Sequence, residues 1–167
     1  IMKNFKFITV VSLLSTMFLF GCKSQEEIYN EINANYLKQI ESNVCGKTIT
    51  AVSSISNKDL DEPLYLFNLC NPLQHKIGFM NQKDISSNIG LLFVFQKEDE
   101  LAFWMKNTHI PLDLAYLNKD NIVISTHTMK PLDLTSIPSP SPAMYVIEMK
   151  QGSFDKYQIK VGTQFNF

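Results

Sequence analysis

The residues best suited to bind a ligand lie close together near the middle of the chain. Trp104 and Lys106 alternate with apolar residues in a predicted strand, so both side chains point to one side of it. Asn107 ends that strand, and Asp113 begins the next one. An aromatic ring beside one cation and one carboxylate is a common arrangement for binding sugars or zwitterions. We therefore take Trp104, Lys106, Asn107 and Asp113 as the candidate ligand site, with an ordinary packed sheet edge as the alternative.

Glu148 lies in another predicted strand, whose two faces are both largely apolar. A carboxylate in that position lies at the margin of the sheet or is buried, and burial without a partner raises its pKa. If the strands bring Lys106, Asp113 and Glu148 together, the three form a polar cluster that can act as an acid and base pair. Structural pairing of Lys106 with Asp113 is the alternative.

Other catalytic patterns are absent from the sequence. His75, His109 and His127 lie in different predicted elements, with neither His-x-His nor His-Glu-x-x-His spacing, which argues against a metal site. The chain has no glycine-rich phosphate loop and no Gly-x-Ser-x-Gly turn. We therefore expect no metal and no cofactor.

The first 21 residues have the composition of a secretion signal. Lys3 and Lys6 precede the apolar run 8–20, which at 1.5 Å per residue spans about 20 Å and is too short for a permanent membrane helix. Leu19-Phe20-Gly21-Cys22 resembles the lipobox of bacterial lipoproteins. Cleavage before Cys22 and attachment of fatty acyl chains such as palmitate would anchor the protein to a bacterial membrane, on the extracytoplasmic side. The alternative is an ordinary signal peptide beside an incidental cysteine.

A polar tether, residues 22–43, joins this anchor to the rest of the chain. Ile28, Ile32, Tyr36 and Ile40 recur at every fourth position, which favours a helix over a disordered spacer, although both remain open. The tether therefore either packs as a helix on the domain or on a partner, or it lifts the domain from the membrane.

Two cysteines lie beyond the tether. An exported location permits a disulfide between Cys45 and Cys70. A free, buried Cys70 in its strand is the alternative, and nothing around either thiol indicates a lowered pKa.

Residues 44–167 have the pattern of a single β-rich domain. Asn71-Pro72 marks the start of a short helix, and Ser153 can cap another that runs through Tyr157. The remaining regular segments are short, rich in β-branched or aromatic residues and separated by turns; they cover 48–52, 64–68, 91–95, 101–106, 112–117, 122–126, 145–149 and 164–167. The pattern predicts a mainly β fold, a small jelly-roll-like β-sandwich or barrel with one or two short helices.

The charge composition argues against nucleic acid as a partner. The chain has 15 basic residues, all of them lysine, against 16 acidic ones, for a net charge of −1. It therefore lacks both the basic surface of a nucleic-acid-binding protein and the arginine side chains that grip phosphates.

Residues 64–167 resemble the bacterial and archaeal family known as domain of unknown function 192. The resemblance rests on Gly90-Leu91-Leu92-Phe93-Val94-Phe95, Phe103-Trp104-Met105-Lys106-Asn107-Thr108, Ile110-Pro111-Leu112-Asp113 and Tyr145-Val146-Ile147-Glu148. Gly78-Phe79-Met80 matches the family's Gly-Leu-Met, but Asn81-Gln82-Lys83 follows where the family usually has an arginine. The resemblance implies a compact, mostly β fold of jelly-roll or barrel type, and it implies no particular activity.

Taken together, the sequence predicts a lipid-anchored protein of the bacterial cell envelope that binds a small molecule or an envelope partner. Two alternatives remain open at this point. One is an enzyme that uses Lys106, Asp113 and Glu148, and the other is a structural or assembly lipoprotein.

Overall fold

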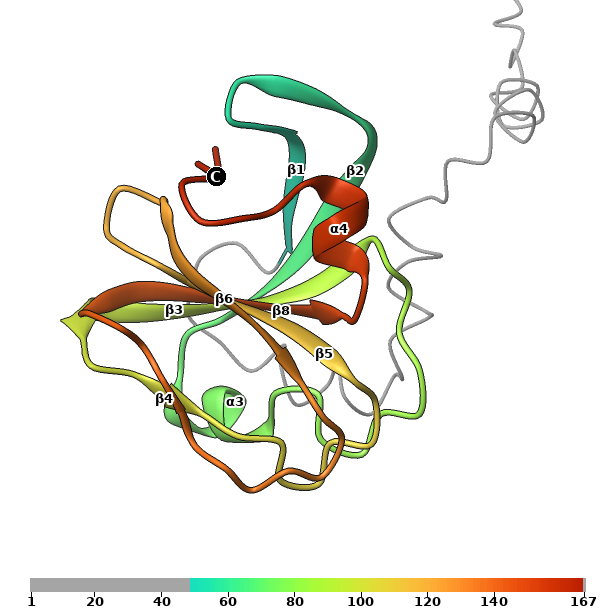
Figure 1. Ribbon diagram of the computed structural model, residues 1–167, viewed down its shortest axis with the longest axis vertical. Helices are drawn as coiled ribbons and strands as arrows, with labels where there is room; N and C mark the ends of the chain where they lie inside the picture. The colour runs from blue at the N-terminus through green and yellow to red at the C-terminus, as the bar shows by residue number, and fades with distance from the viewer. Residues whose placement is uncertain (1–48, 167) are drawn as a thin grey trace, which may run out of the picture. The chain divides into compact units, whose positions relative to one another are not determined.

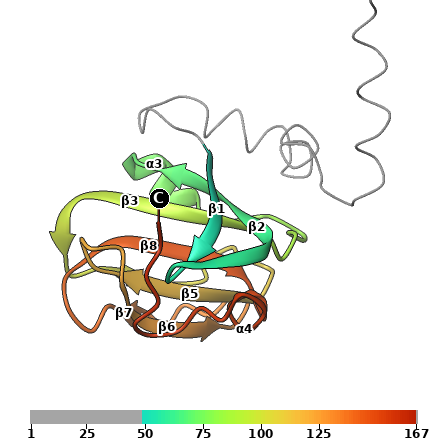
Figure 2. The ribbon, with the colours of Figure 1, turned by 90° about the horizontal axis from the view of Figure 1, so that it is seen from above.

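A computed structural model describes residues 49–166, which form a curved sheet covered on both faces (Figure 1, Figure 2). The six strands lie side by side in the order β1 (Ile49–Ile55), β2 (Lys58–Leu69), β3 (Ile89–Asp99), β8 (Ala143–Lys150), β5 (Leu112–Leu117) and β6 (Val123–Met129). Strands β2 and β3 are parallel, and the other neighbouring pairs are antiparallel. A second, two-stranded sheet consists of β4 (Ala102–Phe103) and β7 (Ile137–Pro138).

Two short helices cover opposite faces of the large sheet. Figure 1 views the sheet nearly edge-on and shows α4 (Ser153–Tyr157) on one side, with α3 (Pro72–Ile77) and β4 on the other. Helix α3 lies in the crossover that a parallel pair such as β2 and β3 requires. Helix α3 begins where the sequence predicts it, whereas α4 begins one residue early: Gly152 is its cap, and Ser153 is its first residue.

Helix α3 begins with a capping box. The Asn71 side chain accepts a hydrogen bond from the Gln74 backbone N–H at 2.9 Å, and the Gln74 side chain accepts one from the Asn71 N–H at 3.2 Å. Pro72 follows at the first helical position, where a missing N–H costs nothing. This local chemistry fixes the start of the helix and therefore the side chains it presents to the sheet.

The main core lies on the α4 face of the sheet. Leu66, Leu92, Ala115 and Ile147 contribute from the four central strands, and Phe154 of α4 packs against them. The apolar side chains of the other face, Phe67, Leu91, Phe93, Leu112, Leu114, Tyr116 and Val146, are also buried. The central strands therefore have two apolar faces, as expected for a sheet covered on both sides.

The C-terminal segment joins the two edge strands at one end. Phe165 forms a β-bridge with Ile55, the last residue of β1, and Gln164 forms one with Ile122, which directly precedes β6. These are isolated bridges instead of the closing strand predicted for 164–167, and the sheet is not closed into a barrel. The mainly β fold class with two short helices is confirmed, and the sandwich-like arrangement fits better than the barrel.

The strand predicted for 101–106 is shorter than expected. Strand β4 ends at Phe103, and the chain then turns. The Thr108 N–H donates to the Met105 carbonyl at 3.1 Å, and Asn107 has a positive φ of 57°. Strand alternation therefore does not extend through Trp104 and Lys106. Within 49–166, no helix has the length and apolar character needed to cross a membrane.

Candidate functional site

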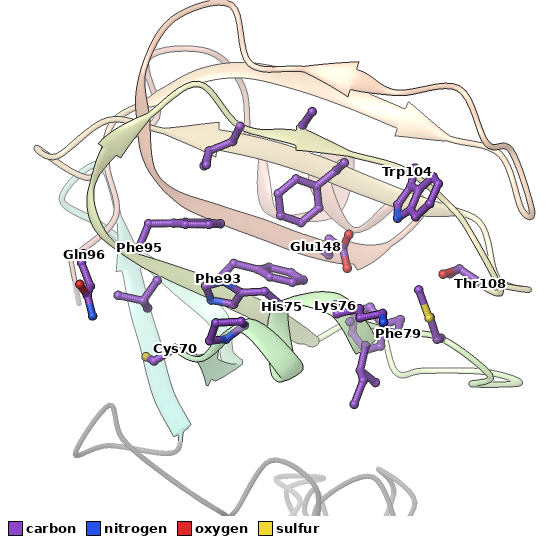
Figure 3. A pocket seen from close by; sticks show the side chains of 18 of the residues that line it. Cys70, His75, Lys76, Phe79, Phe93, Phe95, Gln96, Trp104, Thr108 and Glu148 are labelled. Carbon is purple, nitrogen blue, oxygen red and sulfur yellow. The ribbon is translucent and has the colours of Figure 1, made fainter.

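A cavity of about 700 Å³ opens on the α3 face of the sheet (Figure 3). Helix α3, the residues after it, β3 and β4 form its walls, and β8 contributes a single residue, Glu148. Its aromatic lining consists of His75, Phe79, Phe93, Phe95, Phe103 and Trp104. The cavity is thus largely aromatic, with one buried carboxyl group.

The aromatic rings of this wall pack against one another. Phe93 and Phe103 meet edge to face at 4.9 Å between ring centroids, and Phe103 meets Tyr116 in the same way at 6.0 Å. His75 lies 4.5 Å from Phe95 and 5.7 Å from Phe93. Edge-to-face and tilted contacts of this kind hold rings in defined positions. The Tyr116 hydroxyl also donates to the Ile137 carbonyl at 2.6 Å, which ties β5 to β7.

Glu148 is the charged group at the base of the cavity. In the sheet it lies between Leu91 of β3 and Leu114 of β5, and only 5% of its surface is exposed. Figure 3 shows its carboxyl group pointing into the cavity, with Phe93 on one side and Trp104 on the other. Among residues 49–166 it has no hydrogen-bond or ion-pair partner, and burial raises its pKa from 4.5 to about 8.

Gly78 leaves open the space beside this carboxyl group. Its φ of +45° lies in the region that favours glycine. A Cβ atom at this position would lie 3.5 Å from Glu148 Oε2 and 3.5 Å from Cζ of Phe93. Any larger side chain would therefore project into the part of the cavity nearest to Glu148.

Residues 69–167 match the family DUF192, which is described as an uncharacterized ACR. The chain belongs to the DUF192 family. No protein with curated function matches it. The resemblance predicted from the sequence is therefore confirmed.

Two solved structures have a similar fold. A protein of unknown function from Novosphingobium aromaticivorans aligns with a TM-score of 0.64 and 24% identity, over 74% of this chain and 89% of that one. A putative transcription regulator from Sinorhizobium meliloti aligns with a TM-score of 0.63 and 24% identity, over 71% of this chain and 90% of that one. At this level of identity the likeness shows the fold alone.

Of the predicted ligand site in this DUF192 domain, Trp104 lines the cavity. Its side chain is about half exposed. Lys106 is exposed outside the cavity lining, and its Nζ lies 5.3 Å from the centroid of the Trp104 ring. Asn107 is also exposed; its backbone adopts the left-handed conformation, and its carbonyl accepts a hydrogen bond from the Asn81 N–H at 2.9 Å. Asn107 therefore shapes the turn instead of facing the cavity.

Asp113 lies on the opposite face of the sheet from the cavity. Its carboxylate accepts hydrogen bonds from the N–H groups of Gly152 at 2.8 Å and Phe154 at 3.2 Å, and from the Thr128 hydroxyl at 3.3 Å. It thereby satisfies free backbone donors at the start of α4, as an N-terminal carboxylate does. Its role is structural, and it is not part of the candidate ligand site.

The predicted cluster of Lys106, Asp113 and Glu148 is wrong. In the β5–β8 pair, Glu148 is opposite Leu114, whereas Asp113 is opposite Met149. Adjacent residues in a strand point to opposite faces, so the sheet itself separates the two carboxylates. Asp113 therefore cannot act with Glu148 as an acid and base pair, and the groups around the Glu148 carboxyl group are mainly aromatic.

Sequence reasoning missed most of the cavity lining, including the polar residues His75, Lys76 and Thr108. His75 Nε2 lies 2.8 Å from the Leu69 carbonyl oxygen, and burial lowers its pKa. Lys76 is exposed, and Thr108 is buried, with its hydroxyl donating to the Lys106 carbonyl at 3.3 Å. The helix start at Asn71-Pro72 was a usable signal for α3, but the pairing of β2 with β3 is what brings α3 to this face.

Metal-ligating groups do not cluster anywhere in 49–166. Cys70 is disulfide-bonded. Its predicted partner, Cys45, lies outside the described residues, as do Cys22 and the tether 22–43. The pairing with Cys45 and the lipid on Cys22 therefore stay predictions.

Proposed function

We propose that this DUF192 domain is a binding module whose small-molecule ligand enters the cavity above Glu148. The observation that carries the proposal is a buried carboxyl group, without a partner among residues 49–166, at the base of an aromatic cavity. A volume of about 700 Å³ falls within the range of small-molecule sites. Burying such a group costs free energy, which a ligand that hydrogen-bonds to it would offset.

The side chains of the cavity provide two kinds of contact, apolar and polar. Phe79, Phe93 and Phe103 provide apolar surface for the body of a ligand. Glu148 provides one polar contact that fixes its orientation. Trp104, half exposed, is accessible to a ligand that enters from solvent.

We further propose that the module works at the bacterial cell envelope, anchored through lipid on Cys22. The lipobox-like sequence before Cys22 supports this placement. The disulfide at Cys70 also supports it, because disulfides persist in oxidising compartments outside the cytoplasm. An envelope protein as partner, or a purely structural role, is left as an outcome of the test below.

The test blocks the cavity and compares ligand binding. Ala102 is exposed and lines the cavity, so A102F would place a ring there without entering the core. Lys97 is exposed on β3 outside the lining, which makes K97F the matched control. We expect a screen of amines, zwitterions, sugars and carboxylates, followed by thermal unfolding of the full-length protein in detergent, to identify ligands that stabilise the wild type and K97F but not A102F.

Two outcomes would overturn the binding function. In the first, no compound of the screen stabilises the wild type. In the second, compounds bind A102F as tightly as K97F, which would place their site elsewhere. Recovery of the same membrane protein by pull-down with both variants would then favour the structural or assembly role.

A further inference from the structure

We infer that the ligand of this cavity is an organic cation, an ammonium group attached to an apolar body. This inference rests on the proposed function and specifies its ligand. It is carried by the charge of the cavity, the nature of its walls and the position of the single buried carboxyl group.

The cavity contains a place for a positive charge that no side chain in the described part of the chain fills. Its ionisable lining consists of Glu148 and Glu100 on the acidic side and Lys76 on the basic side, with His75. Glu100 and Lys76 are both exposed, so water screens their charges. His75 is held neutral near pH 7, because burial lowers its pKa. The formal charges of Glu100 and Lys76 offset each other, so the lining gains a net negative charge only when the buried Glu148 carboxyl group is ionised.

The walls of the cavity favour a cation over other groups. The faces of Trp and Phe rings attract ammonium groups electrostatically, and attraction grows when water is excluded. The Trp104 ring already lies 5.3 Å from the Lys106 ammonium, so its π-system is accessible to positive charge. Phe93 and Phe103 are held by edge-to-face packing and line the same cavity as Glu148. Rings and carboxylate together resemble the aromatic cages that bind alkylated ammonium groups.

An anionic ligand fits this cavity poorly. Its charge would oppose the ionised form of Glu148, which is buried, and repulsion between like charges is stronger at a buried position than in water. A neutral hydrogen-bond acceptor would need Glu148 to stay protonated. A cation instead stabilises the ionised form, so its binding should release the proton of Glu148 to solvent when the pH lies below the pKa of that group.

The pH dependence of binding follows from the groups that face Glu148. Tyr116 on β5 stays protonated, because burial and the charge of Glu148 raise its pKa. On α3, burial lowers the pKa of His75, so it is neutral at pH 7, and the Lys76 side chain is exposed. Glu100 is exposed at the margin of the lining. Glu148 is therefore the group expected to titrate between pH 7 and 8.5, and the affinity for a cation should rise about tenfold per pH unit until its pKa is reached.

The experiment compares a charged probe with its uncharged counterpart. Trp104 is the single tryptophan of the chain, so its fluorescence reports binding at the cavity. The full-length protein in detergent would be titrated at pH 8.5 with 4-phenylbutylamine, which is charged, and with 4-phenyl-1-butanol, which is not. We expect the amine to bind at least about tenfold more tightly, and E148Q to lose this preference while still binding the alcohol. K97Q, which changes an exposed charge outside the cavity, should behave as the wild type.

The outcomes separate this inference from the proposed function. Equal affinities for both probes, unchanged by E148Q but weakened by A102F, would overturn the cation while leaving the binding function intact. Tighter binding of 4-phenylbutyrate than of the amine would do the same. If E148Q does not fold, the pH dependence of amine binding to the wild type provides the test. An affinity for the amine that is the same at pH 6.5 and 7.5 would contradict the inference. Binding of neither these probes nor any compound of the wider screen would overturn the function itself.

Discussion

The ionisation of a single residue, Glu148, affects the stability of the whole domain. Burial raises its pKa from 4.5 to about 8, so its carboxyl group binds a proton more tightly in the folded protein than in the unfolded one. The free energy of unfolding must therefore decrease as the pH rises between these two values, and this loss is complete above about pH 8. The protein tolerates this cost at the position where the proposed ligand would bind.

The variant E148Q isolates this effect. Because glutamine cannot ionise, we expect E148Q to be more stable than the wild type above pH 8, on the order of 3 kcal/mol, and similar in stability at pH 5. His75 and His127, whose pKa values burial lowers, change stability in the opposite direction below pH 6.5. The quantity to measure by urea denaturation is therefore the difference in free energy of unfolding between E148Q and the wild type at each pH. A difference that does not grow between pH 5 and 8 would contradict the burial argument.

Asp113 should prove structural. Replacing it with alanine leaves the N–H groups of Gly152 and Phe154 without their acceptor. We expect D113A to lower the free energy of unfolding by about 2 to 3 kcal/mol, and not to change the relative affinities for the two probes. D120A, at an exposed turn, is the control and should have little effect. A selective loss of probe binding in a fully folded D113A would show that Asp113 acts in the site after all.

At the scale of elements, the pairing of β3 with β8 holds the site together. Gly90 of β3 lies opposite Met149, next to the residue that points into the cavity. A Cβ at Gly90 would come within 2.8 Å of the Glu148 carbonyl oxygen and 2.9 Å of Leu66 Cδ2. The close approach of backbone to backbone therefore leaves no room for any side chain.

The variant G90A tests this close approach. We expect it to lower the free energy of unfolding by at least about 2 kcal/mol, because the backbone of β8 must move. G162A is a contrasting variant: Gly162 has a φ of +88° and open space around it, so only its conformation is penalised, by about 1 kcal/mol. Denaturant titration of both variants would rank them. Equal losses would argue that packing at Gly90 is looser than the structure shows.

At the scale of the whole molecule, the proposed envelope location depends on the first 22 residues, which lie outside the described part of the chain. Two or more acyl chains give stable anchoring, whereas one chain gives only marginal membrane binding. In the cells that make this protein, we expect radiolabelled palmitate to be incorporated and the protein to sediment with membranes. The variant C22S should lose the label and the sedimentation, while K23A keeps both. An unlabelled wild type would contradict the proposed anchor.

The disulfide at Cys70 provides a second test of location and connectivity. We expect mass spectrometry of the unreduced protein to find Cys70 linked to Cys45. Closing a loop of about 26 residues stabilises the folded state by about 3 kcal/mol in the chain-entropy model, so C70S should lose about that much. A peptide that links Cys70 to Cys22 would contradict both the pairing and the lipidation.

The sequence alone determined the elements and part of the site. The β-rich pattern, the capping box that begins with Asn71-Pro72 and the short second helix are local properties, fixed by residues within a few positions of one another. The burial of Glu148 was also predictable, because apolar residues surround it on both faces of its strand. Trp104 does line the cavity, although β4 ends before it and the predicted strand alternation does not reach it.

Tertiary structure decided which side chains meet. The two backbone N–H groups that donate to Asp113 lie 39 and 41 positions away, and local alternation cannot reveal that they cover the face opposite Glu148. Likewise, His75 and Lys76 reach the cavity because the parallel pairing of β2 and β3 carries α3 across one face of the sheet. Periodicity determines which residues share a face within one strand, but long-range pairing and the placement of the covering helices determine what each face contacts.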